Sequence, residues 1–139
     1  MANFYTQYSA FVAEKLTPEE KVWCERALKL AERWYDNRGT IMPSITIDRD
    51  AIWVHDDDGG DIEEAVRLVQ MFFERWRPQA VASIEFAHTC DRPRVGAFGG
   101  GAVVFTASTD EWISTGMWAA KLMGELQEEL QAACLAEID

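Results

Sequence analysis

Residues 44–64 read SITIDRDAIWVHDDDGGDIEE, and this stretch decides the fold. Two short runs at 44–47 and 51–54 are rich in β-branched residues and flank a polar triplet, which predicts a β-hairpin. Asp61 then opens a capping box, so a helix is expected to start there and to end before Pro78. A hairpin that leads into a helix indicates an α+β protein.

The segments before the hairpin predict two helices. A short first helix is expected over 4–16, because apolar residues recur there at helical spacing. Thr17 and Pro18 then form a strong helix start signal, and Gly39 is well placed to end this long second helix in a left-handed cap.

The segments after the 61–76 helix predict two strands and a last helix. Residues 80–88 alternate in the manner of a strand that places His88 on its core face, and 102–106 is the expected partner strand. Thr115 is expected to cap a final amphipathic helix.

These elements give the order α-α-β-β-α-β-β-α in a single domain over residues 1–139. No Pro/Gly/Ser linker and no repeat divides the chain. Successive hairpins and helices favour a mostly antiparallel four-stranded sheet packed with helices. The second sheet face is expected either to meet water or to pair with a second subunit, which would make a homodimer.

The formal net charge is −11, from 24 acidic and 13 basic residues. Such a surface repels nucleic acid on average and attracts a basic protein, although excess negative charge also serves solubility. The residues expected on an acidic partner surface are Asp56, Asp57, Asp58, Asp61, Glu128 and Glu129.

The lack of a targeting signal and the spacing of the cysteines predict a cytoplasmic protein. The first residues lack a basic segment followed by an apolar one, and no stretch reaches the roughly 20 apolar residues that cross a bilayer. Cys24, Cys90 and Cys134 are odd in number and far apart, which favours reduced thiols. No membrane contact is expected.

The acidic run at 56–61 invites comparison with a calcium loop, because hard cations prefer several carboxylate oxygens. The spacing fails the EF-hand test, since Gly60 and Arg67 stand where ligands are needed. A solvated loop with a helix cap, a divalent metal site and a contact with a basic partner remain alternatives. No metal or other cofactor is predicted.

His88 and Cys90 stand two residues apart and could join a thiol to a base. A catalytic pair also needs an orienting group and an oxyanion hole, and the sequence points to neither. A structural role is therefore the main expectation, and no catalytic residue is assigned.

Residues 90–102 are the hardest to explain by structure alone. Two arginines spaced by Pro93, followed by glycines with accessible N–H groups, have the ingredients of an anion-binding loop. The alternative is a bulge or close backbone crossing, with the arginines paired to carboxylates. The residues expected to bind a ligand or partner are His88, Arg92, Arg94, Phe98, Gly99, Gly100 and Gly101.

This segment resembles a group of small, uncharacterised proteins from bacteriophages and other mobile elements. The shared motifs are Cys-x-Arg/Lys-Pro-Arg, Phe/Tyr-Gly-Gly-Gly-Ala and Ser/Asn-Thr-x-x-Trp. In this chain they fall at Cys90 to Arg94, Phe98 to Ala102 and Ser114 to Trp118. The resemblance implies an accessory protein and supplies no catalytic residue.

The leading hypothesis is a non-enzymatic phage or mobile-element protein that docks to a basic host protein and inhibits a defence or nucleic-acid-handling complex, in the manner of anti-CRISPR proteins. It would not bind nucleic acid directly. The alternative is a protein that binds or sequesters a nucleotide or other anion through Arg92, Arg94 and the glycines. An enzyme is the third hypothesis.

Overall fold

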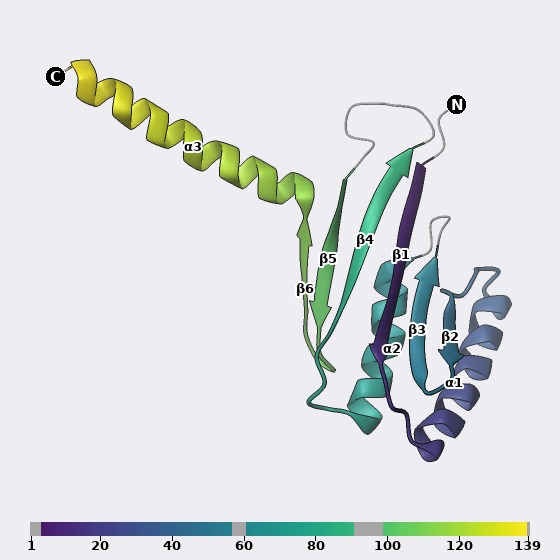
Figure 1. Ribbon diagram of the computed structural model, residues 1–139. Helices are drawn as coiled ribbons and strands as arrows, with labels where there is room; N and C mark the ends of the chain where they lie inside the picture. The colour runs from purple at the N-terminus through teal and green to yellow at the C-terminus, as the bar shows by residue number, and fades with distance from the viewer. Residues whose placement is uncertain (1–3, 57–60, 91–98, 139) are drawn as a thin grey trace.

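The computed structural model describes residues 4–56, 61–90 and 99–138 (Figure 1). It is an α+β structure with three helices and one six-stranded antiparallel sheet. In chain order the elements are β1 (Phe4–Ala13), α1 (Pro18–Asn37), β2 (Ile45–Asp48), β3 (Ala51–Asp56), α2 (Ile62–Trp76), β4 (Ala82–Cys90), β5 (Gly99–Phe105), β6 (Asp110–Ser114) and α3 (Thr115–Ile138).

The predicted element order and the four-stranded sheet differ from this structure in two places. Residues 4–13 form a strand and not a helix, because β1 lies between β3 and β4 and exchanges backbone hydrogen bonds with both. The second difference is β6, a short strand that was not predicted from the sequence. It pairs with β5 across a turn in which the Thr106 N–H donates to the Thr109 carbonyl.

The sheet order is β2-β3-β1-β4-β5-β6. The first six elements, β1 to β4 with α1 and α2, have the split βαβ arrangement of ferredoxin-like domains. The β5–β6 hairpin extends this sheet at the β4 edge. Such a fold supports many unrelated functions, so function must be argued from surfaces and sites.

The core lies on one face of the sheet, under α1 and α2. Ile84, Val103 and Phe105 on β4 and β5 are almost fully buried, and Phe105 stacks on Phe73 of α2 with ring centroids 5.7 Å apart. Alternate strand residues point the other way and stay partly or fully exposed. The helices therefore leave the opposite face of the sheet open.

The predicted helix ends are confirmed for α1 and corrected for α3. Thr17 forms the expected capping box with Glu20, and Gly39 follows α1 at φ +67°. The Ser114 hydroxyl, and not Thr115, caps α3 by accepting from the Met117 N–H at 3.2 Å. The Thr115 hydroxyl instead accepts from the Gly100 N–H.

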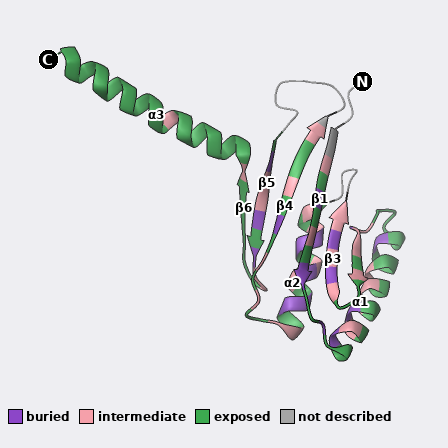
Figure 2. Cartoon of the chain, viewed as in Figure 1, coloured by how far each residue is buried: buried purple, intermediate pink, exposed green. Residues whose placement is uncertain are grey.

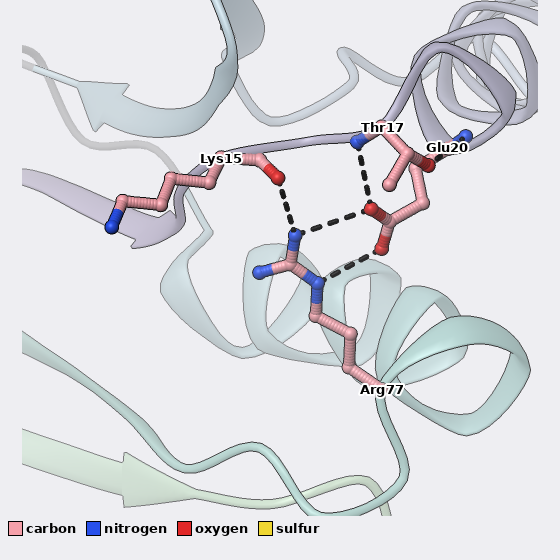
Figure 3. Close-up of polar contacts among 4 residues, drawn as sticks. All are labelled: Lys15, Thr17, Glu20 and Arg77. Atoms are coloured by element: carbon pink, nitrogen blue, oxygen red, sulfur yellow. Dashed lines mark hydrogen bonds and ion pairs between the residues drawn. The ribbon is translucent and has the colours of Figure 1, made fainter.

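A buried ion pair joins α1 to the end of α2 (Figure 3). The Arg77 Nε donates to Glu20 at 2.9 Å, and a second guanidinium nitrogen donates to the Lys15 carbonyl. Glu20 is only 5% exposed and also accepts from the Thr17 N–H. The hydrogen bond from Arg77 is the main reason why the pKa of Glu20 lies below its ordinary value.

Helix α3 contributes no buried residue, in contrast to the expected packing of helices on the sheet. It leaves the β6 edge and projects away from the rest of the chain (Figures 1 and 2). Its apolar side chains, expected to face the core, are exposed, with Leu126 at 49% and Leu130 at 66%.

Candidate functional site: the open face of the sheet

The open face of the sheet carries an aromatic centre built from β1 and β3. Phe11 pairs with Trp53 across the two strands, and their ring centroids lie 6.4 Å apart. Phe11 is 53% exposed, although it stands in a central strand. A large aromatic side chain presented in this way is typical of a protein-docking surface.

Polar contacts hold Trp53 in place. Its Nε1 donates to the Ser9 hydroxyl at 2.8 Å, and its ring stacks on His55 with centroids 3.8 Å apart. The His55 Nε2 lies 3.0 Å from the Thr46 hydroxyl. The aromatic centre is therefore organised before any partner arrives, which lowers the entropy lost on binding.

Apolar and acidic side chains surround this centre. Val104 and Ile113 extend the apolar surface over β5 and β6, and they are 48% and 53% exposed. Asp48, Glu85 and Glu111 point to the same side on β2, β4 and β6 and are exposed. We call this surface, from Asp48 across Phe11 and Trp53 to Ile113, the open face.

None of the six strands described in Figure 1 contains Lys or Arg. The charged side chains that the strands place on the open face are thus carboxylates. By charge alone, such a surface repels anionic groups and attracts cationic ones. This agrees in sign with the net charge of −11.

The described members of the predicted acidic surface do not lie together. Asp56 ends β3, and Asp61 caps α2 by accepting from the Glu64 N–H. Glu128 and Glu129 lie far along α3, which leaves the opposite edge of the sheet (Figure 1). Asp57 and Asp58 lie outside the described residues.

The glycine run has a packing explanation within the sheet. A Cβ on Gly100 would collide with the Phe86 carbonyl, and one on Gly101 with the Ile113 carbonyl. The two glycines thus permit β5 to approach β4 on one side and β6 on the other, as in the close backbone crossing named as one alternative. Arg92, Arg94 and Phe98 lie outside the described residues, so the expected ligand loop is described only at Gly99 to Gly101.

His88 is exposed, whereas the sequence predicted it on the core face of its strand. It lies on the helix-side face beyond α2, where its Nδ1 is 3.1 Å from the Thr6 hydroxyl and its ring contacts Phe86 at 5.3 Å between centroids. Cys90 ends β4 two residues later.

The described parts of the chain contain neither a cluster of metal-ligating side chains nor a helix suited to span a membrane. Residues 4–56, 61–90 and 99–138 contain no group of three or more His, Cys, Asp or Glu that could hold a metal ion. No helix in these ranges is both long and apolar enough to cross a membrane.

Because residues 4–16 were predicted to form a helix, the open face was not predicted from the sequence. Helical spacing would separate Ser9 from Phe11, whereas a strand points both to the same side. The alternation of Tyr8, Ala10 and Val12 with Ser9 and Phe11, in a segment rich in aromatic residues, is the signal that could have revealed it.

No protein-family model, curated protein or solved structure matches this chain.

Proposed function

We propose that the protein is a non-enzymatic binding protein that docks to a basic protein through the open face. The observation that carries this proposal is the combination of an exposed, pre-organised aromatic centre with carboxylates as the charged side chains that the strands place on that face. In the phage or mobile-element context of the resemblance, the partner is a host protein of a defence or nucleic-acid-handling complex, which the binding inhibits.

The composition of the open face fits the anatomy of a protein interface. Aromatic residues dominate the energetic centre of such interfaces, and polar residues form the rim. Phe11 and Trp53 supply the centre, while Asp48, Glu85 and Glu111 supply the rim. Rim charges mainly accelerate association with a partner of opposite charge, so the binding is expected to weaken as salt rises.

A basic host groove that normally holds nucleic acid is one surface of suitable chemistry. The carboxylates of the open face would occupy the places of phosphates, and the aromatic centre would add affinity that a phosphate backbone does not supply. The anion-binding alternative rests on Arg92 and Arg94, which lie outside the described residues, and the contacts of β5 with β4 and β6 already account for Gly100 and Gly101.

The test is capture of a host partner by two variants with the same change in net charge. Glu85→Lys with Glu111→Lys reverses the open face, and Glu25→Lys with Glu32→Lys reverses two exposed residues of α1. The tagged protein captures its partner from host lysate, and the dissociation constant is then measured with the purified pair at low and high salt.

We expect the open-face variant to weaken binding by roughly 100-fold and the α1 variant to bind as the unaltered protein does. Phe11→Ala should weaken binding without changing its salt dependence, because it removes contact area and not charge. Equal loss of binding in both charge variants would show that net charge alone explains the loss, and this would contradict the proposal.

A further inference from the structure

Helix α3 carries an unpartnered apolar stripe. The stripe residues recur at helical spacing and are Trp118, Ala119, Leu122, Met123, Leu126, Leu130, Ala133 and Cys134. All are exposed (Figure 2). Lys121, Glu128 and Gln131 lie on the opposite side, together with the exposed Met117 and Leu135, so apolar surface is concentrated on the stripe but not confined to it.

The same chain has an apolar groove between α1 and α2, with a volume of about 670 Å³. Ile45, Ile47 and Ile52 of the sheet line it, and Leu30 and Met71 on the helices are 64% and 59% exposed beside it. The groove has the composition of sites that receive the apolar face of a helix.

Polar contacts between the two helices lie at one end of the groove. The Tyr35 hydroxyl of α1 donates to Glu64 of α2 at 2.7 Å, and Arg67 lies 3.8 Å from the same carboxylate. The helices therefore keep a fixed relation to each other at this end.

We propose that α3 of one copy docks its apolar stripe into the α1–α2 groove of a second copy, and that the exchange is reciprocal. The described residues of one chain leave both the stripe and the groove uncovered, and a two-fold dimer covers both pairs at once. Each protomer contributes eight stripe residues and the thirteen groove-lining residues that are not buried in the single chain. This total lies within the roughly 20–30 residues per side of a stable interface.

The occupant is a second copy because α3 is anchored far from the groove of its own chain. Ser114 caps α3 directly at the end of β6, and Thr115 accepts a hydrogen bond from Gly100 of β5, so no linker lets the helix turn back. The groove lies at the β2 edge and α3 at the β6 edge (Figure 1). Five strand spacings separate these edges, or about 24 Å.

Charge complementarity also favours the groove over pairing between two α3 helices. Helix α3 contains four glutamates and one lysine; Glu125 borders the stripe, and Glu129 and Glu137 fall within it. Two such helices side by side would bring like charges together. The groove is instead lined by two arginines and one carboxylate, since Arg26 and Arg67 stand on its two helices and Glu64 lies 3.8 Å from Arg67.

The first test is the mass of the full chain by light scattering over a concentration series. The unaltered protein is expected at twice its 15.8 kDa chain mass. Leu126→Glu on α3 and Leu30→Glu in the groove should each weaken the dimer by roughly 100-fold, because a symmetric dimer meets every substitution twice. Gln131→Glu adds the same charge on the polar side of α3 and should leave the dimer intact.

Folding does not confound these variants, since Leu126 and Leu30 are exposed in the single chain. Circular dichroism should report the same helix content for the monomeric variants at matched concentration. A single-chain mass for the unaltered protein would overturn the proposal. A dimer that Leu126→Glu breaks and Leu30→Glu spares would indicate α3–α3 pairing and would also overturn it.

The second test mixes the two monomeric variants. The Leu30→Glu chain keeps an intact α3, and the Leu126→Glu chain keeps an intact groove, so the mixture should form a heterodimer through one unaltered contact. A mixture that stays monomeric while the unaltered protein dimerises would contradict reciprocal exchange. These results are independent of the proposed function, which is read from Glu85, Glu111 and Phe11 on the open face.

Discussion

Arg77 and Glu20 show how a few polar atoms fix the relation of two helices at the scale of single residues. Glu20 belongs to the first turn of α1 and is also part of its capping box, while Arg77 is the residue that follows α2. Their hydrogen bonds therefore tie the start of one helix to the end of the other (Figure 3). Removing Arg77 leaves the buried Glu20 carboxylate without its guanidinium partner, which costs more than losing an exposed pair.

We expect Arg77→Ala to lower the free energy of unfolding by about 3 kcal/mol, because the Glu20 carboxylate loses its guanidinium in a buried site. Lys21→Ala is the matched control. It removes the exposed pair with Asp50 and should cost less than about 1 kcal/mol. Urea unfolding followed by circular dichroism measures both values, and equal costs would show that burial does not strengthen the Glu20 pair.

The same ion pair predicts a dependence of stability on pH. Because the hydrogen bond from Arg77 lowers the pKa of Glu20 in the folded state, the pair contributes fully above the ordinary value of 4.5. The contribution is lost as the pH falls through the lower folded pKa. Urea midpoints at a series of pH values should therefore fall less steeply below 4.5 in Glu20→Gln, and parallel curves for the two proteins would exclude a linked role for Glu20.

At the scale of elements, α3 differs from the other two helices. Helices α1 and α2 bury residues such as Cys24 and Phe73 in the core, and their caps are satisfied by side chains. Helix α3 has a cap at Ser114 and exposed apolar side chains, and no part of the chain that the structure describes covers them. Amphipathicity thus predicts that a helix needs a partner surface without saying which surface provides it.

We expect a chain that ends at Gly116 to keep the sheet, α1 and α2 folded, because α3 buries no residue. Its thermal midpoint should equal that of monomeric Leu126→Glu within a few degrees, while helix content falls by the share of α3. Differential scanning fluorimetry and circular dichroism give the two readouts. A large fall in the midpoint relative to Leu126→Glu would mean that α3 stabilises the core of its own chain.

At the scale of the whole molecule, surfaces with different chemistry lie on different sides. The open face joins residues of β1, β2 and β3 with the β5–β6 extension, whereas the groove lies on the helix side and α3 leaves one edge. A dimer made through α3 and the groove would leave both open faces uncovered. Partner binding and self-association can therefore be separated by mutation.

The sequence by itself determined the α+β class, the β2–β3 hairpin, the caps of α1 and α2, and the strongly acidic balance. Each of these follows from residues within a few positions of each other or from composition. Thr17 with Glu20, and Gly39 after α1, are local signals of this kind, and the structure places them as predicted.

Only the tertiary structure decided that residues 4–13 are a strand, that Phe11 and Trp53 meet, and that α3 stands free of its own core. Trp53 is 42 positions from Phe11 along the chain, so the spacing of residues within either segment does not predict their contact. β1 gains hydrogen bonds from two distant neighbours, and this gain outweighs its helical spacing. Local pattern sets what an element can form, and long-range pairing selects which form is kept.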